Sequence, residues 1–414
     1  MLTMTTCDVQ SYRSAVSALA MQHLMLTAAM VVLFVCTKSY VNQLRRQHAR
    51  CTVVIIGAGP VGLTSLIIAS RNPHVNRIVV YEEASRLALV NRAHQIAFDR
   101  KTVLFLKGLD VDFDNMEGFF EKNIFYTRIG IFLEYLLNKL PRVPVPLDLK
   151  METKFTRERV QEVETLEGRK VVLACDGSTG EAARLLGLSD EFEQNSCKAY
   201  GATASMDRAD QCCVPMAERR YHGLIFDLAA YGIDTSDMQD ASGFTLKLFG
   251  SSRYRYMSLA IPKSESMLVK NMRLILDRSM MRNIFIKCFN SCRASSESEL
   301  NETWALRNMK FSPRLFDIKL FQRRETVAYF EDADMFVCAE GEAARCYNFQ
   351  TGLDVNMALK GLMTLHGMLE MAACSQTEYD VMSAMVMKAR DSAGISKVYL
   401  SKGLPQSIFS TSFS

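Results

Sequence analysis

Several functional classes are excluded by what the sequence lacks. The six histidines stand at no metal-ligand spacing, and the twelve cysteines contain no CxxC pair, so no zinc or other metal site is predicted. No P-loop and no Ser-His-Asp arrangement is present. No basic run with interleaved aromatics occurs, and the net charge of +4 is small for 414 residues, which argues against nucleic acid as a partner. The cysteine usage suits a reducing compartment better than secretion.

Apolar residues, by contrast, are abundant. They make up 49% of the chain, which is enough for a substantial core and unlike the composition of a disordered protein. The length allows two domains, or one large domain with an inserted subdomain.

The most informative stretch is Cys51–Leu63. It begins as a β-branched apolar run, typical of a strand buried in a parallel sheet, and continues through Gly57-x-Gly59-Pro60-x-Gly62 into a predicted helix at 63–70. A second strand at 77–82 ends in Glu82, at the spacing expected for a ribose-binding acid. This order predicts a dinucleotide site. The alternatives are a structural glycine turn and a solvated acid at the strand end.

Residues 14–36 contain no Asp, Glu, Lys or Arg and are long enough to cross a bilayer. Basic residues follow this stretch at Lys38, Arg45, Arg46 and Arg50, whereas only Arg13 precedes it. The positive-inside rule then predicts a single-pass anchor with the remaining chain in the cytoplasm. A cleaved signal peptide and a buried helix are the alternatives, although a signal peptide carries its positive charge before the apolar run.

The rest of the chain alternates between two patterns. Short apolar strands at 170–175 and 336–338 are typical of a parallel sheet, with helices expected at 102–109, 128–140, 181–188 and from about 352 to 371. Alternating segments at 244–249 and 255–261, with a helical segment near 268–288, predict a separate sheet-bearing region. The polar segment after 375 is helix-like.

Two further acids follow predicted strands. Asp176-Gly177 comes directly after the strand 170–175, where a carboxylate can accept hydrogen bonds from a ribose and the glycine lets the chain turn. Gly341-Glu342 follows the strand 336–338 in the same way. Either acid could instead be a purely structural turn residue, and Arg92 could be a surface or capping arginine.

Together these motifs resemble the class A flavoprotein monooxygenases, the fold of para-hydroxybenzoate hydroxylase and kynurenine 3-monooxygenase. The resemblance covers residues 52–188 and 333–370, and the middle only by architecture. It implies that Glu82 holds the adenosine ribose, that Arg92 lies near the flavin, and that Asp176-Gly177 touches FAD and NAD(P)H. Gly341-Glu342-Ala-Ala resembles the motif whose acid holds the ribityl chain. Gly352 and Asn356 resemble the turn that follows it beside the flavin ring.

The third motif departs from the family pattern. Glu342 replaces an aspartate, Asp354 replaces the second glycine of the flavin-side turn, and Arg345 stands where many members have histidine. The proline usually found downstream is missing. An arginine at 345 could offset the charge of Asp354 or replace another flavin contact.

The implied architecture is an α/β protein with a Rossmann-like FAD domain in two sequence pieces, an inserted β-rich substrate domain and an N-terminal transmembrane helix. Its segments are 1–50 (anchor and basic linker), 51–190 and 333–375 (FAD domain), 191–332 (substrate domain) and 376–414 (tail).

The implied activity is monooxygenation of a small organic substrate with FAD as cofactor and NADH or NADPH as reductant. A flavin reductase or oxidase, and a catalytically silent membrane-tethered binding protein, are the alternatives. No catalytic acid or base is identified. The candidate cofactor-binding residues are Gly57, Gly59, Pro60, Gly62, Glu82, Arg92, Asp176, Gly177, Gly341, Glu342, Gly352 and Asn356.

Overall fold

The structure is a computed structural model. It describes residues 6–92, 95–178, 180–193, 199–208, 216–224, 244–250, 254–262, 276–295, 297–318, 321–346 and 354–401. The chain divides into two units, Met1–Arg50 and Cys51–Ser414.

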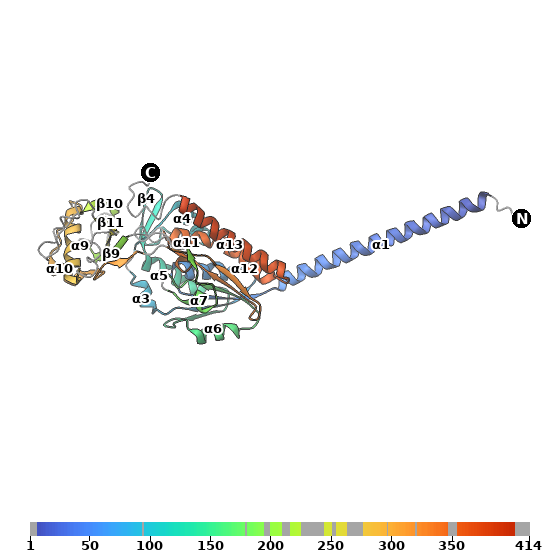
Figure 1. Cartoon of the computed structure of the whole chain (residues 1–414), viewed down its shortest axis with the longest axis horizontal. Helices are drawn as coiled ribbons and strands as arrows, with labels where there is room; N and C mark the ends of the chain where they lie inside the picture. Colours follow the sequence, from blue (N-terminus) through green and yellow to red (C-terminus); the bar gives the residue numbers. More distant parts are fainter. Residues whose placement is uncertain are drawn as a thin grey trace. The chain divides into compact units, whose positions relative to one another are not determined.

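The first unit contains one helix, α1 (Thr6–His48), drawn as a continuous ribbon in Figure 1. Within it, Leu19–Lys38 is long and apolar enough to span a membrane, and its 20 residues have no buried side chain. At 1.5 Å per residue this segment is about 30 Å long, the thickness of a bilayer's hydrocarbon core. The span lies slightly later than the predicted 14–36.

The second unit is built on a six-stranded sheet in the order β16-β17-β7-β1-β2-β6. All neighbouring strands are parallel except β16 and β17. The bounds are Cys51–Ile56 (β1), Val75–Tyr81 (β2), Leu147–Lys150 (β6), Arg169–Ala174 (β7), Val327–Phe330 (β16) and Met335–Ala339 (β17). The central strands are fully buried because helices cover both faces, which explains their unbroken β-branched sequence.

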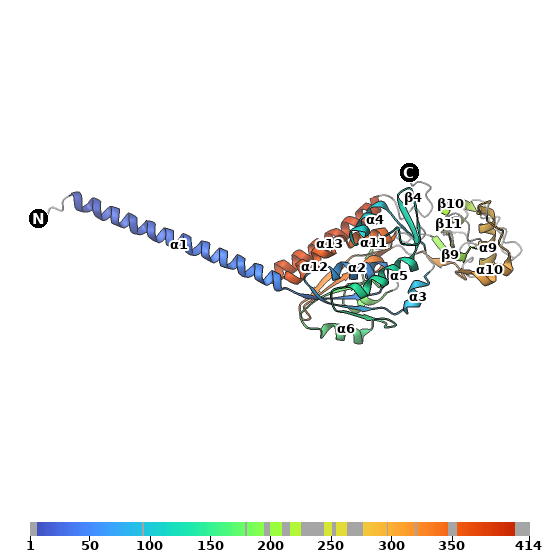
Figure 2. The ribbon, with the colours of Figure 1, turned by 180° about the vertical axis from the view of Figure 1, so that it is seen from behind.

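The two faces of this sheet have separate helical layers, visible on opposite sides in Figure 2. On one face, Val54 and Ile56 belong to a cluster that includes Val163 of α6 (Arg157–Glu164) and Ala182 of α7 (Ala182–Leu185). The other face is covered by α2 (Pro60–Ser70), α5 (Ile129–Lys139) and α12 (Leu365–Cys374). The helix predicted at 181–188 is shorter in the structure. It forms the single turn α7 and ends before Gly187, whose φ is 88°.

A small sheet, β3-β5-β4, was not predicted from the sequence. Its strands are Gln95–Phe98 (β3), Phe119–Glu121 (β4) and Ile124–Arg128 (β5), flanked by α3 (Arg86–Val90) and α4 (Arg100–Gly108). Phe98, Phe113, Phe125 and Phe132 meet edge to face beneath it, with centroid distances of 4.8–6.3 Å. These aromatic contacts hold β3 and β5 against α5.

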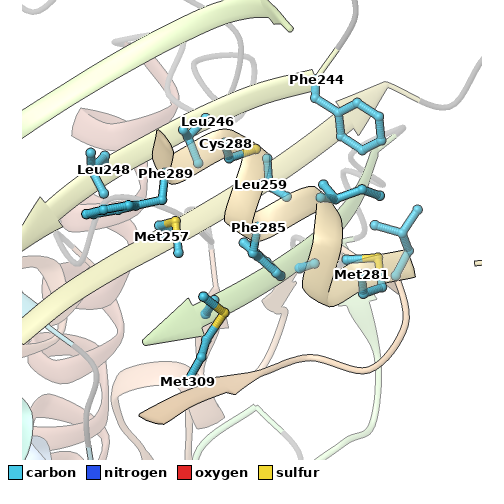
Figure 3. Close-up of a cluster of buried hydrophobic side chains, with 14 of the residues drawn as sticks. Phe244, Leu246, Leu248, Met257, Leu259, Met281, Phe285, Cys288, Phe289 and Met309 are labelled. Atoms are coloured by element: carbon cyan, nitrogen blue, oxygen red, sulfur yellow. The ribbon is translucent and has the colours of Figure 1, made fainter. Parts of the chain in front are cut away.

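The middle of the chain forms an antiparallel sheet, β10-β11-β12-β9-β13, with β14 also on β9. Its strands are Ala199–Asp207 (β9), Met216–Leu224 (β10), Phe244–Gly250 (β11), Tyr254–Pro262 (β12), Met309–Phe311 (β13) and Phe316–Asp317 (β14). One face packs on α9 (Arg278–Cys292), near α10 (Glu302–Asn308). Figure 3 shows Leu246, Leu248, Met257 and Leu259 facing Phe285 and Cys288 of α9. Alternation places the next residues, such as Tyr254 and Tyr256, on the opposite face.

Two features after residue 320 differ from the sequence prediction. β16 lies inside the segment 191–332 expected for the substrate domain, but it forms a hairpin with β17 and extends the main sheet instead. The helix expected to reach about 371 is two helices, α11 (Asp354–Gly361) and α12, separated by a turn. α11 ends at Gly361, because glycine is a poor helix residue. The carbonyl of Gly361 accepts a 3.0 Å hydrogen bond from Lys388 of α13 (Glu378–Ser401).

Candidate functional site

The turn between β1 and α2 depends on three glycines with different geometry. Gly57 has φ of 96°, and a Cβ there would lie 2.5 Å from the carbonyl oxygen of Cys175. A Cβ on Gly62 would lie 1.8 Å from the carbonyl oxygen of Gly57, so helix and turn can pack only if this side chain is absent. A Cβ on Gly59 would meet nothing within 4 Å. The backbone at Gly59 is therefore open to a ligand.

Glu82 links this turn to the end of β2. Its carboxylate is buried and accepts hydrogen bonds from the backbone N–H of Ala58, at 2.5 Å, and of Ala84, at 2.8 Å. Each carboxylate oxygen has a further lone pair, so the group can also accept hydrogen bonds from a ligand hydroxyl. A solvated strand-end acid would not be held in this way.

Asp176 follows β7 and lies across the turn from Gly57. One carboxylate oxygen, Oδ2, accepts a 2.8 Å hydrogen bond from the N–H of Ala182, whereas the buried Oδ1 has no hydrogen-bond partner in the described parts of the chain. Burial raises the pKa of Asp176, and the hydrogen bond from Ala182 offsets part of this effect. Gly177, with φ of 84°, makes the turn beside it.

The third motif forms a 3-10 turn, η4 (Gly341–Ala343), after β17. Gly341 has φ of 63°, and a Cβ there would lie 2.9 Å from a methyl of Val61 in α2. Glu342 is exposed and lines the cavity described next. Surrounding protein desolvates it and raises its pKa, while the positive charge of Arg92 lowers it.

These motifs line one cavity of about 820 Å³. The volume lies within the range of small-molecule and cofactor sites. Eight predicted residues line it: Gly57, Gly59, Pro60, Glu82, Arg92, Asp176, Gly177 and Glu342. Gly62 and Gly341 shape the turns behind its wall, and Gly352 lies outside the described residues.

Asn356 connects α11 to the small sheet. Its side chain does not line the cavity but pairs with β3, donating a 2.6 Å hydrogen bond to the carbonyl of Ala97 and accepting a 2.9 Å bond from the N–H of Asp99. Lys360, on the next turn of α11, forms an ion pair with Asp99. These contacts fix α11 against β3, so that Val355 and Ala358 face the cavity.

Several cavity residues were missed from the sequence. Gln95, Ile96 and Ile129 come from the small sheet and the start of α5, and Tyr256 comes from β12 of the second sheet. Thr153, Lys154 and Phe155 follow β6. No local motif marks them, because each reaches the cavity through contacts between distant segments.

Arg345 does not line the cavity either. It is buried and donates a 2.9 Å hydrogen bond to the carbonyl of Ser392 in α13. A second contact joins the same helix to the third motif, because Lys388 forms a buried ion pair with Glu340. α13 therefore braces the loop that carries Glu342.

No protein-family model matches the sequence, and no curated protein matches it. Solved structures match most of its length at low identity. CtdE in complex with FAD is 12% identical, with a TM-score of 0.52 over 84% of this chain and 92% of that one. The tetrameric form of 2-methyl-3-hydroxypyridine-5-carboxylic acid oxygenase is 13% identical, with a TM-score of 0.53 over 82% and 86%. p-Nitrophenol 4-monooxygenase PnpA from Pseudomonas putida DLL-E4 is 12% identical, with a TM-score of 0.52 over 88% and 91%. The fold is that of the class A flavoprotein monooxygenases.

In this class A fold the two sheets meet at the cavity, since Tyr256 of the antiparallel sheet and the strand ends of the parallel sheet line it together. The antiparallel sheet therefore contributes one wall of the cavity. In the sequence, this part of the chain resembles the family only by its architecture. Ligands of open α/β sheets bind outside the carboxyl ends of the strands, where Glu82, Asp176 and Glu342 lie.

The buried pair Lys388–Glu340 yields a stability prediction. Lys388→Met leaves the Glu340 charge buried without its partner, which should lower the free energy of unfolding by about 3–5 kcal/mol. The double variant Lys388→Met/Glu340→Gln removes that charge and should recover most of the loss. Urea unfolding followed by circular dichroism measures both. Arg324→Met breaks an exposed ion pair with Glu191 and serves as the control, with at most about 1 kcal/mol expected. Equal losses in all three variants would contradict the assignment.

Glu342 yields a pH prediction. Because its pKa is raised above the ordinary value of about 4.5, its stabilising contribution is complete below pH 4.5 and is lost as the pH rises through the raised pKa. In ligand-free protein, the neutral Glu342→Gln variant should therefore melt at a higher temperature than the wild type at pH 7 and at the same temperature as the wild type at pH 4. Thermal melts from pH 4 to 8 test this, with exposed Glu331→Gln as the control. A difference that does not vary with pH would refute the prediction.

Proposed function

We propose that this chain is an FAD-dependent monooxygenase of a small organic substrate, reduced by NADH or NADPH and anchored to a membrane by α1. The observation that carries the proposal is the single cavity that joins the glycine turn to Glu82, Asp176 and Glu342 within a class A fold. When bound, FAD supplies the redox chemistry, accepting a hydride from NAD(P)H and enabling transfer of one oxygen atom from O₂.

The residues present fit FAD. The open backbone at Gly59 leaves room for a pyrophosphate, and the first N–H groups of the eleven-residue helix α2 lie next to it. The buried Oδ1 of Asp176, which has no hydrogen-bond partner in the parts of the chain that the structure describes, can accept a hydrogen bond from a ligand hydroxyl. A cavity lined by both apolar and polar side chains suits a dinucleotide with a planar ring.

Contacts among the lining residues indicate which part of FAD each would hold. Glu82 and Thr153 lie together, since the N–H of Thr153 donates to the carbonyl of Glu82 at 2.8 Å, and we assign this region to the adenosine ribose. Gly59 and Pro60 would receive the pyrophosphate. Asp176 and Glu342, on adjacent strand ends, would hold the ribityl chain.

The flavin ring would occupy the region around β3 and α11. Arg92 lies within electrostatic reach of Glu342 there, and Val355 and Ala358 supply apolar walls. The substrate would enter between this ring and Tyr256. The chain's part in the reaction is to orient both molecules and to exclude water from between them.

FAD binding is tested by Gly59→Glu in the full chain. Since no atom lies near the Gly59 Cβ position, the variant should fold, while its side chain blocks the pyrophosphate. We expect flavin absorbance in the purified wild type and its loss in the variant, with unchanged circular dichroism. Gly367→Glu, at another glycine with open space, should keep the flavin. A folded wild type that cannot be loaded with FAD would overturn the proposal.

Turnover separates monooxygenation from its alternatives. NAD(P)H oxidation coupled to an oxygenated product supports the proposal, whereas peroxide release without product indicates a reductase or oxidase. Bound FAD without any NAD(P)H oxidation indicates the silent binding protein.

The anchor is supported by the apolar span Leu19–Lys38 and by the basic residues that follow it. The full chain should stay in the membrane pellet after alkaline carbonate extraction, and a variant lacking residues 1–50 should move to the supernatant. Protease protection in sealed vesicles should find residues 51–414 on the cytoplasmic side. A protein that is found in the supernatant and lacks residues 1–36 would instead indicate a cleaved signal peptide.

A further inference from the structure

A second groove, of about 330 Å³, lies at the opposite end of α2 from the glycine turn. We call it the α2–α4 groove. Its apolar wall consists of Ile68, Leu104, Phe105, Leu109, Leu362 and Met363. Two of these side chains are open to solvent, since Leu104 is 59% and Met363 is 45% exposed. Large apolar side chains exposed side by side around an apolar groove are typical of an interaction surface.

The groove lies next to the point where the chain enters the second unit. Arg71, at the end of α2, donates hydrogen bonds to the carbonyls of Gly108, at 3.3 Å, and Leu109, at 2.9 Å, which joins the end of α4 to the end of α2. Three residues later, the carbonyl of His74 accepts a 2.8 Å hydrogen bond from the N–H of Cys51, the first residue of this unit. The groove therefore belongs to the edge of the main sheet at which β1 begins.

The length of chain before Cys51 limits how far this edge can lie from the membrane that α1 is proposed to span. The apolar span ends at Lys38, and α1 continues to His48. Ten helical residues and three extended steps give the chain between Lys38 and Cys51 a reach of at most about 26 Å. The edge that holds Cys51 therefore stays close to the lipid headgroups in any orientation of the second unit.

The charges beside the groove favour an anionic surface. Lys101 and Lys107 lie one turn before and one turn after Leu104 on α4, both are exposed, and neither forms an ion pair among the residues that the structure describes. α4 itself contains no acid. The acid that follows it, Asp110, is paired with Arg71 at 2.7 Å. An exposed leucine between lysines is typical of a helix that lies on anionic lipid.

We propose that the α2–α4 groove and the exposed face of α4 lie on a membrane surface of anionic phospholipid. Leu104 and Met363 insert below the headgroups, and Lys101 and Lys107 contact the negative headgroups around them. This inference rests on the anchor in the proposed function and adds a second membrane contact to it. The second contact fixes the orientation of the second unit, because a single helix leaves that unit free to rotate above the bilayer.

Quenching of tryptophan fluorescence by brominated acyl chains tests the contact in the full chain. Trp304 is the only tryptophan, so Trp304→Phe gives a background into which Leu104→Trp is introduced. Leu306→Trp is the matched control, because Leu306 of α10 is 61% exposed and lies outside the groove. In vesicles of phosphatidylcholine and phosphatidylserine, bromination should lower the emission of Leu104→Trp at least twofold and leave that of Leu306→Trp unchanged.

Charge reversal tests the lipid class. Lys101→Glu/Lys107→Glu, added to Leu104→Trp, should abolish most of the quenching, as should vesicles without phosphatidylserine or a raised salt concentration. Arg307→Glu/Lys310→Glu reverses two exposed charges of the antiparallel sheet region and should change nothing. Quenching that does not respond to phosphatidylserine or to the reversals at 101 and 107 would overturn the assignment to anionic lipid.

Carbonate extraction of the same vesicles reports on the anchor separately. Anchored protein in which Leu104→Trp is not quenched would refute the second contact and leave the proposed function intact, whereas protein released to the supernatant would refute both the anchor and the contact. An unquenched Leu104→Trp whose emission shifts to the blue as the protein concentration rises would assign the groove to a second copy of the chain instead.

Discussion

The packing of α2 onto β1 through the glycine turn is the constraint on which the rest of the site depends. A side chain at Gly62 would collide with the carbonyl of Gly57, and one at Gly57 with the carbonyl of Cys175 after β7. The turn therefore fixes three backbone segments against one another without any side chain between them. Of the three glycines in this turn, only Gly59 has open space at its Cβ position. The same motif therefore packs the helix against the sheet at two glycines and leaves room for a ligand at the third.

The three carboxylates around this turn are held in different electrostatic environments. Glu82 receives two backbone N–H groups, which substitute for water around its charge. Asp176 receives one and keeps a buried oxygen without a hydrogen-bond partner among the described residues, and Glu342 interacts with the charge of Arg92. Burial accordingly raises the pKa of the last two. A buried carboxylate oxygen in the cavity wall can accept a hydrogen bond from a ligand hydroxyl. The free energy lost by desolvating this oxygen in the ligand-free protein is then offset when the ligand binds.

The third motif, which departs from the family pattern, is in contact with the C-terminal helix α13. Arg345 donates a hydrogen bond to the carbonyl of Ser392 in α13 and is not among the described residues that line the cavity. The same helix supplies Lys388, which neutralises Glu340 immediately before the motif. The C-terminal helix thus supports the loop from behind, a role that the polar, helix-like sequence after residue 375 did not reveal. Asn356, which the sequence predicts to lie beside the flavin, joins α11 to β3 through two hydrogen bonds.

The sequence alone determined the parts whose geometry is local. The succession of strand, glycine turn, helix and acid from Cys51 to Glu82 has a fixed spacing because one turn must join a parallel strand to its helix, and eight predicted residues line the cavity accordingly. Tertiary structure decided the rest. Gln95 and Tyr256 lie far apart along the chain and carry no motif, yet both line the cavity. Two antiparallel pairings, β3 with β5 and β12 with its neighbours, set which of their side chains face inward. A shift of one residue in either pairing would turn them away, and no local spacing encodes that register.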